Sequence, residues 1–350
     1  MAAGTPVLPG GSNTYIKDFK SSGKLQVGFS RNPNKFPLPN YAQTVPVERD
    51  AGFYLNINVE QAGRIVDADL QEFVWPDGAD MPVNNDGTEQ FNFKDFRTKR
   101  YAYSFKLGQK AKEQADFDIE KTNAAILAQR AMTARTQKAV SVLTTDANWD
   151  ASHIATVSGI SGNTGAWDAS TTARQDIKRS LHHADEVIAA DTLGVVEQSQ
   201  MMLLINPYTA KAISRCQEIV DHIKGSPQAY EQVKGGTGKF AKYGLPDTLY
   251  GYPIVIENTF KVTTVRGASA KTTQRVLPNG VAFMLSQVGE LVNENEGPNF
   301  STLSMFVYED MSVETKDDPD NRRSLGRIVD DFDVVLTAPA SGFYFKGVVS

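Results

Sequence analysis

The sequence has little of the chemistry on which most enzymes depend. Its 350 residues include one cysteine and four histidines. The single cysteine, Cys216, excludes an internal disulfide framework and fits a reducing compartment. No segment approaches the ~18 consecutive apolar residues of a membrane-spanning helix, and no basic region followed by an apolar run stands near Met1. Neither secretion nor membrane insertion is expected.

The four histidines do not form a metal-binding pattern. His182 and His183 are adjacent and would point about 100° apart on a helix, so they cannot chelate one ion together. No cysteine or carboxylate follows His153 or His222 at a spacing of three or four residues. We therefore expect histidines at the surface or at caps, and neither a metal nor a cofactor.

One glycine-rich stretch, KGGTGKF at 234–240, resembles a phosphate-binding loop at first sight. A Walker loop would need Gly at 233 and Ser or Thr at 240, but the chain has Val233 and Phe240 there. The stretch also follows no predicted strand. Because glycine clusters outside a strand-to-helix turn are mostly hinges, we expect a flexible loop.

Apolar residues are abundant enough for a substantial core. They make up 41% of the chain, and 36 basic against 41 acidic residues leave a net charge of only −5. This mild imbalance favours neither a dedicated nucleic-acid binder nor an acidic tail. The length suits two domains or one elaborated domain.

The first 51 residues predict an extended arm, because prolines and glycines interrupt any helix or central strand. Residues 52–112 then contain the alternating stretches FYLNINV, FNFKDF and YAYSFKL, which predict a long, exposed, two-stranded ribbon. Such a ribbon is marginal in water unless it packs on a neighbouring surface.

The clearest predicted element is a helix from Asp118 to Leu143. An acidic cap candidate and Glu120 stand at its start, and no glycine or proline interrupts it. An alternating α/β segment follows, in which PYTAKAISRCQEIVDHI predicts a helix opened by Pro207 with Cys216 buried in it. Strands dominate the end of the chain.

Near that end, ETKDDPDNRRSLG at 314–326 concentrates charge. A calcium loop starting at Asp317 or Asp318 would want a glutamate where Ile328 or Val329 stands, so that pattern fails. Three interpretations remain: a solvated hairpin turn whose arginines screen its own carboxylates, an intermolecular contact, or a carboxylate-dependent site.

The charges along the chain are sorted, which favours a contact. Residues 94–112 carry a net charge of +6, whereas residues 290–333 carry −8. Complementary surfaces of this kind steer and register subunits. The candidate subunit-interface residues are Lys94, Arg97, Lys99, Arg100, Lys106, Glu314, Asp317, Asp318, Asp320, Arg322 and Arg323.

In this order, arm, ribbon, long helix, α/β block and final strands resemble the major capsid protein of tailed bacteriophages, with its Hong Kong 97 fold. The resemblance covers nearly the whole chain. It also extends to the local sequence rhythm of AWDASTTARQDIKRSLHHADEVI, MMLLINPYTAKAI, KYGLPDTLYGYPIVIEN and DVVLTAPASGFYFKGVV.

The resemblance implies an α+β fold with four parts. These are an N-terminal arm at 1–51, an extended loop (E-loop) ribbon at 52–112, a peripheral (P) domain with the spine helix at 113–170 plus about 301–350, and an axial (A) domain at 171–300. The arm carries cations that would face DNA or a neighbouring subunit: Lys17, Lys20, Lys24, Arg31 and Lys35.

The implied function is structural and catalyses no reaction. Copies of the chain would self-assemble in the host cell cytoplasm into pentamers and hexamers of an icosahedral virion capsid around packaged double-stranded DNA. Scaffold, portal or decoration proteins are further expected partners, and a membrane is not. Two alternatives stay open: an encapsulin-type nanocompartment shell of the same fold, and a carboxylate-dependent hydrolase using Asp317 and Asp320.

Overall fold

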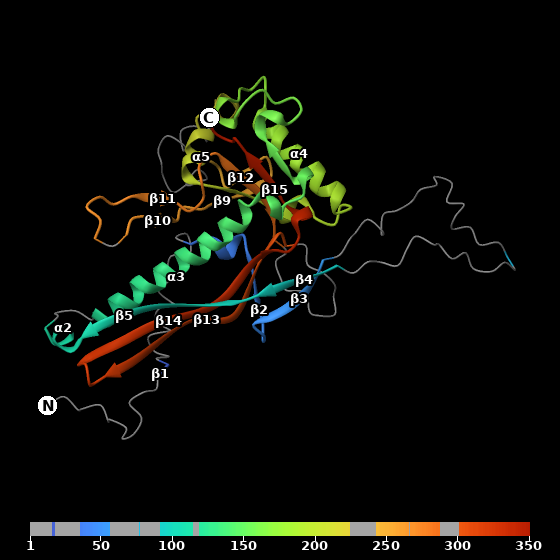
Figure 1. The fold of residues 1–350 in the computed structure, drawn as a ribbon. Coiled ribbons are helices and arrows are strands. Elements are labelled where there is room, and N and C mark those ends of the chain that lie inside the picture. Colours follow the sequence, from blue (N-terminus) through green and yellow to red (C-terminus); the bar gives the residue numbers. More distant parts are fainter. Residues whose placement is uncertain are drawn as a thin grey trace.

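The computed structural model describes residues 16–17, 36–56, 77, 92–114, 119–224, 243–265, 267–287 and 301–350. Figure 1 shows an elongated sheet with one long helix along it, and an α/β domain at one end of that sheet. A two-stranded ribbon leaves the junction on the side opposite the tip of the sheet. This is an α+β architecture, as expected. No helix within the described ranges is long and apolar enough to cross a membrane.

The elongated sheet is built on one long hairpin. β13 (Leu303–Asp318) and β14 (Arg323–Leu336) pair in antiparallel fashion, and β5 (Lys99–Gly108) pairs with the other edge of β14. The outer edge of β13 receives β1 (Ile16–Lys17) and β2 (Gln43–Pro46). At ~3.4 Å per residue, β13 extends roughly 50 Å.

The ribbon consists of β3 (Ala51–Asn56) and β4 (Asn92–Arg97), paired antiparallel. Its second predicted strand was expected to continue through YAYSFKL. Instead those residues belong to β5 in the long sheet, where Tyr103 and Phe105 pack beside the long helix. The alternation of apolar residues predicts a strand but not the strand with which it pairs. The sequence therefore could not distinguish β4, in the ribbon, from β5, in the long sheet.

The long helix, α3 (Ile119–Leu143), confirms the predicted element, while Asp118 lies outside the described residues. Its buried face is made largely of small side chains and lies on β14 and β5. Small residues let the helix axis approach the sheet closely. The buried apolar residues are Ala124, Leu127, Ala128, Ala131, Ala139, Val140 and Leu143.

The α/β domain is built on a six-stranded sheet in the order β6-β15-β12-β7-β9-β8. Its strands are β6 (Ile154–Thr156), β7 (Met201–Ile205), β8 (Thr248–Leu249), β9 (Tyr252–Ile256), β12 (Val281–Ser286) and β15 (Phe343–Lys346). A separate hairpin, β10 (Phe260–Val262) and β11 (Thr273–Arg275), projects from it.

Helices pack against this sheet around one large apolar core. They are α4 (Asp176–Asp191), α5 (Pro207–Ile213) and α6 (Gln217–Ile223). The single helix predicted after Pro207 is therefore wrong, because the chain breaks at Ser214–Cys216 and α6 starts afresh. Cys216 is buried, as predicted. A short helix at the tip of the long sheet, α2 (Gln109–Glu113), completes the described helices.

Part of the proline-rich segment is not extended but enters the core. Leu38, in the 3₁₀ turn Leu38–Asn40, and Tyr41 are both buried against the junction of the two sheets. The Tyr41 hydroxyl donates to Glu257 at 3.0 Å. The phosphate-loop candidate at 234–240 lies outside the described residues.

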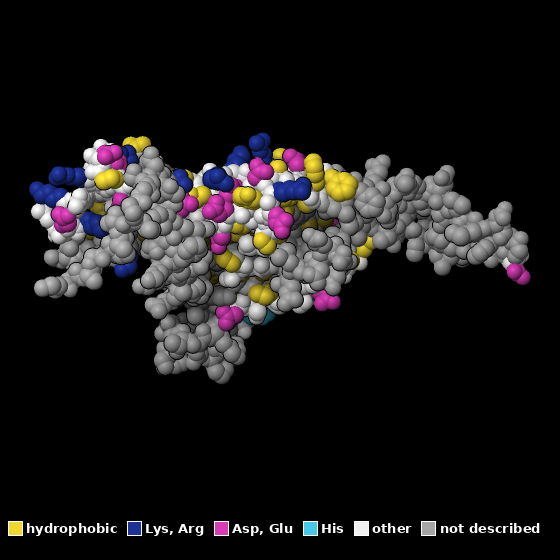
Figure 2. Space-filling model, turned by 90° about the horizontal axis from the view of Figure 1, so that it is seen from below, with side chains coloured by type: hydrophobic (Ala, Val, Ile, Leu, Met, Phe, Trp, Pro, Cys, Tyr) yellow, Lys and Arg dark blue, Asp and Glu magenta, His cyan; other side chains and the backbone are white. Residues whose placement is uncertain are grey.

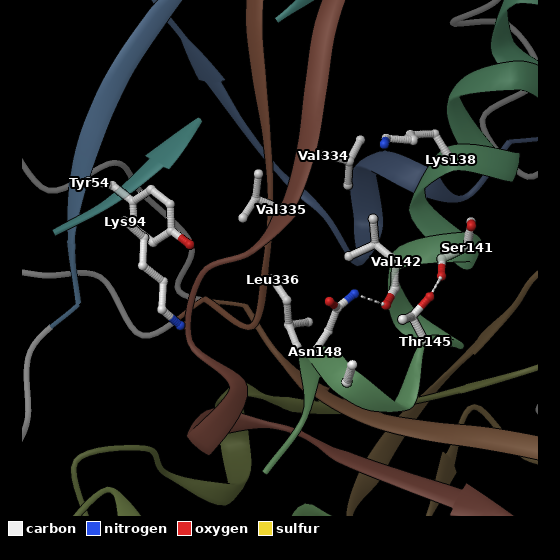
Figure 3. Close-up of a pocket in the computed structure, with 11 residues that line it drawn as sticks. Tyr54, Lys94, Lys138, Ser141, Val142, Thr145, Asn148, Val334, Val335 and Leu336 are labelled. Atoms are coloured by element: carbon white, nitrogen blue, oxygen red, sulfur yellow. Dashed lines mark hydrogen bonds between the residues drawn. The ribbon is translucent and has the colours of Figure 1, made fainter. Parts of the chain in front are cut away.

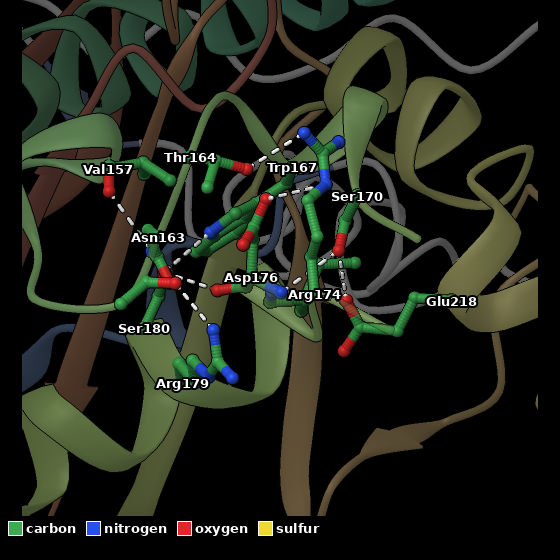
Figure 4. A network of polar contacts seen from close by, with 12 residues as sticks. Val157, Asn163, Thr164, Trp167, Ser170, Arg174, Asp176, Arg179, Ser180 and Glu218 are labelled. Carbon is green, nitrogen blue, oxygen red and sulfur yellow. Dashed lines mark hydrogen bonds and ion pairs between the residues drawn. The ribbon is translucent and has the colours of Figure 1, made fainter. Parts of the chain in front are cut away.

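A buried polar network fixes the start of α4 (Figure 4). The Glu218 carboxylate accepts hydrogen bonds from the Ser170 hydroxyl and from the backbone N–H groups of Ile177 and Lys178. The Ser170 oxygen in turn accepts from the backbone of Asp176 at 2.9 Å. A carboxylate at this position satisfies helix N-H groups that have no partner within the helix.

His153 corrects the expectation of surface histidines. It is fully buried, with Nδ1 2.6 Å from the Gly342 carbonyl and Nε2 2.7 Å from the Asp191 carboxylate. His182, His183 and His222 are exposed, as predicted. The sequence carries no sign of this difference, because the partners of His153 come from distant parts of the chain.

Candidate subunit interface

The acidic stretch forms the tip of the β13–β14 hairpin. Asp318 accepts hydrogen bonds from Asn321 at 2.9 Å and from Arg323 Nε at 2.8 Å. These bonds, first from Asn321 and then from Arg323, lower the pKa of the Asp318 carboxyl. Asp317 accepts from Ser324 at 2.8 Å. The hairpin-turn interpretation is confirmed, and the described residues hold no cluster that could bind a metal ion.

Part of the sorted charge is neutralised inside one chain. Arg327 Nε lies 2.5 Å from Glu314, across β13 and β14. Arg100 on β5 lies 3.3 Å from Asp331 on β14. Basic and acidic segments thus pair within their own sheet, which reduces the unpaired charge that each segment offers to a neighbouring copy. Both pairs are partly buried, since Asp331 and Glu314 are largely covered while their arginines reach solvent.

A buried ion pair ties α3 to the sheet. Arg135 donates from Nε and Nη2 to Asp330, at 2.9 and 2.5 Å, and from Nη2 to Asp310 at 2.8 Å. Burial raises the pKa of Asp330, and the guanidinium partly opposes that shift. Both acids belong to the acidic segment 290–333 that was expected to contact a neighbour, and the charge pattern gave no prediction for Arg135. An arginine on the alanine-rich face of the helix was the available signal.

Several predicted interface cations remain exposed. Arg97, Lys99 and Lys106 are open to solvent, as are Asp317, Asp320 and Arg322 at the hairpin tip. Within the described part of the chain, no ion pair engages the side chains of Lys94, Lys99 or Lys106. These groups are free to meet charges on another molecule. Of the arm cations, Lys17 lies in β1 and the others fall outside the described residues.

One face of the ribbon presents two phenylalanine rings to solvent, with the exposed Asp95 paired opposite Phe53. Phe53 is 76% exposed and Phe93 is 63% exposed. On the opposite face Tyr54 and Phe96 stack on Phe306, with ring centroids 6.0 and 4.2 Å away. Figure 2 shows hydrophobic side chains grouped where the described part of the ribbon ends, and cations and acids interspersed along the rest of that side.

A groove of about 500 Å³ runs beside the base of the ribbon (Figure 3). Tyr54 and Lys94 line it from the ribbon, Lys138 and Ser141 from the end of α3, and Val334 to Leu336 from β14. The Thr145 hydroxyl is bonded to the Ser141 carbonyl, at 2.7 Å. The lining combines lysine, hydroxyl and amide groups with apolar surface.

Comparisons with known proteins agree with this picture at the level of the fold. No family model matches the chain, and no curated protein matches it. A phage-related protein from Bordetella bronchiseptica RB50 is similar in structure, with a TM-score of 0.61, 14% identity, and 96% of this chain and 99% of that chain covered.

Two assembled shells are similar as well. The bacteriophage PhiM1 mature capsid has a TM-score of 0.55 and 11% identity, over 99% of this chain and 91% of that chain. The holo-SrpI encapsulin complex from Synechococcus elongatus PCC 7942 has a TM-score of 0.50 and 10% identity, over 91% and 89%. At these identities the likeness establishes architecture: the chain has the Hong Kong 97 fold that phage capsid subunits share with an encapsulin.

Proposed function

We propose that the chain is a structural subunit that self-assembles into a closed icosahedral shell, as a major capsid protein does. The observation that carries the proposal is the ribbon, which leaves the body with Phe53 and Phe93 facing solvent. A two-stranded ribbon with an uncovered apolar face needs a second surface. Another copy of the chain supplies one in a shell.

In this proposal each part of the fold has a role in assembly. Residues 52–112 contain the extended loop over a neighbouring copy, α3 is the spine of the peripheral domain, and residues 171–300 form the axial domain. Copies meet in pentamers and hexamers through heterologous contacts that close into rings. Many weak contacts then add up to a stable particle.

The proposed content of the shell is double-stranded DNA, held without sequence preference. The support is the cationic arm together with the likeness to phage capsids. Assembly would take place in the host cytoplasm and the product would be the virion capsid, with scaffold, portal or decoration proteins as further partners. The same fold also occurs in an encapsulin, so a nanocompartment shell is the second candidate.

A hydrolase has less support than a shell subunit. Asp317 and Asp320 lie at an exposed hairpin tip, and Asp317 accepts a bond from Ser324. Carboxylate catalysis needs a pocket that holds the substrate and perturbs the acid. We therefore assign the tip a role in contact, not in chemistry.

Particle size and content together test the proposal. We expect the purified chain, or particles isolated after its expression, to give closed shells by negative-stain microscopy and light scattering. DNA inside them should resist nuclease until the shells are opened. A monomer at all concentrations would refute the shell, whereas shells filled with an enzyme would favour the nanocompartment. If a chain lacking residues 1–24 packages DNA as well as the full chain does, the arm has no role in DNA binding.

A further inference from the structure

The β10–β11 hairpin projects from the α/β domain with apolar side chains in solvent (Figure 1). Phe260 is 49% exposed, Val262 55% and Val265 80%. Phe260 and Val262 are two positions apart on one strand, so they share a face of the hairpin. A two-stranded hairpin gains little stability alone, and an uncovered apolar face on it indicates a missing partner.

The hairpin is also uniformly basic. Residues 260–275 include four basic residues and no acidic one. Lys271 is exposed and Lys261 is half-buried, and neither forms an ion pair with any residue that the structure describes. The Arg275 guanidinium lies over the Phe260 ring, 4.5 Å from its centroid. The partner of this surface should therefore combine apolar contact with negative charge.

The end of α4 and the loop after it offer such a surface. Leu193 is 46% exposed and Val195 is 52% exposed. Leu193 has a φ of +51°, a left-handed conformation that glycine or asparagine usually takes after a helix. A leucine held in this conformation with its side chain in solvent costs free energy. Contact with another molecule would compensate for that cost.

Acidic side chains surround these two residues. Glu186 lies on α4, seven positions before Leu193 in the chain, and Glu197 lies two residues after Val195; both are exposed. Glu186 has no ion-pair partner among the described residues. One carboxylate oxygen of Asp191 lies within hydrogen-bonding distance of His153 Nε2. The surface thus has two exposed apolar side chains and a negative charge that complements the basic hairpin.

The two surfaces lie on opposite sides of the α/β domain. In Figure 1 the hairpin projects from one side, and α4 borders the other. One copy cannot bring them together, but the hairpin of one copy can meet the α4 end of the next. Complementary patches on opposite sides generate a heterologous contact, which closes into a ring when the rotation allows it.

We infer that the β10–β11 hairpin of one copy binds the Leu193–Val195 surface of the next copy around each pentamer or hexamer. Phe260 and Val262 cover Leu193 and Val195, while Lys271, in the loop between the two strands of the hairpin, faces Glu186 and Glu197. This contact rests on the proposed shell function and specifies which surfaces of the axial domain join neighbours.

A cysteine pair tests the contact directly. Val262→Cys and Val195→Cys in one chain should give intermolecular disulfides in assembled particles, seen as a ladder on a non-reducing gel. Cys216 is buried, so we expect it to form no intermolecular disulfide. Each single variant should stay monomeric on the gel. The matched control pair joins Val262→Cys with Ser158→Cys, an exposed site elsewhere in the domain.

Charge reversal provides a second measurement. Glu186→Lys with Glu197→Lys should raise the concentration needed for assembly at least about tenfold, and Lys271→Glu in the same chain should lower it again. If the unmodified chain forms no shells, the proposed function fails. If shells form but the cysteine pair does not crosslink, or crosslinks no better than the control pair, this contact is wrong and the function stands.

Discussion

At the scale of single residues, Arg135 carries a positive charge into the contact between α3 and the long sheet. Both of its carboxylate partners come from strands near the end of the chain, and Asp330 is fully buried. Removing one partner of a buried pair leaves the other charge without compensation. The pair therefore fixes where the helix lies, whatever its net contribution to stability.

The substitution Arg135→Met measures this dependence. We expect the free energy of unfolding to fall by about 3–5 kcal/mol, because Asp330 would remain buried and unpaired. Urea denaturation followed by circular dichroism gives the value. Arg130→Met on the same helix is the control: Arg130 is exposed over the Tyr103 ring, and its loss should cost less than about 1 kcal/mol. Equal losses would contradict the buried-pair account.

Glu257 makes stability depend on pH. Burial raises the pKa of Glu257 above 4.5, although bonds from Thr259 and Tyr41 oppose the shift. The folded chain therefore holds this proton more tightly than the unfolded chain does. As pH rises from 4.5 through the folded-state pKa, the free energy of unfolding must fall on account of this group.

Comparing Glu257→Gln with the unmodified chain isolates that contribution. Thermal unfolding is measured between pH 4 and 8 for both chains. As pH rises from 4.5 to the folded-state pKa of Glu257, the variant should become more stable relative to the unmodified chain, and at higher pH the difference in their free energies of unfolding should stay constant. Glu48→Gln, at an exposed glutamate, should follow the unmodified chain. A difference between Glu257→Gln and the unmodified chain that does not vary with pH would show that burial does not raise this pKa.

At the scale of elements, the ribbon separates folding from association. Phe53→Ser with Phe93→Ser should leave the melting temperature nearly unchanged, because both rings face solvent, but should prevent or weaken particle formation. Light scattering and calorimetry on the same sample give both values. Tyr54→Ser is the contrasting variant: its ring stacks on Phe306, so we expect it to lower the melting temperature. Normal particles from the double variant would contradict the role given to this face.

Elements with strong local signals were predictable, and their partners were not. The helix to Leu143 follows from an uninterrupted run of helix-forming residues. The strand YAYSFKL follows from alternation, yet its place beside β14 depends on residues synthesised far later in the chain. The same limit applies to the interface. The charge distribution marked the segments that contain Arg100 and Asp331 as contact surfaces, but it did not predict that these two side chains pair within one chain. Pairing across long sequence distances leaves no local pattern.

At the scale of the whole molecule, contacts between copies remain a prediction for the basic and acidic segments. Arg100 and Asp318 already have partners in their own chain, so the sharper test uses the exposed Lys99 and Asp317. Lys99→Glu should impair shell formation, and Asp317→Lys in the same chain should partly restore it, as judged by negative-stain particle counts. Lys178→Glu serves as a control reversal. Unaltered particles from Lys99→Glu would count against the pairing.

The pairing of β5 with β14 also governs when a copy becomes competent to associate. Lys99 of β5 pairs with Phe332 of β14, and at about 5–20 residues per second the ribosome needs roughly ten seconds or more to synthesise the chain between them. Through that interval β5 has no strand beside it, and the hairpin tip does not yet exist. If the chain assembles as proposed, we expect an unfinished copy to lack surfaces needed to join a growing particle, so that folding precedes association.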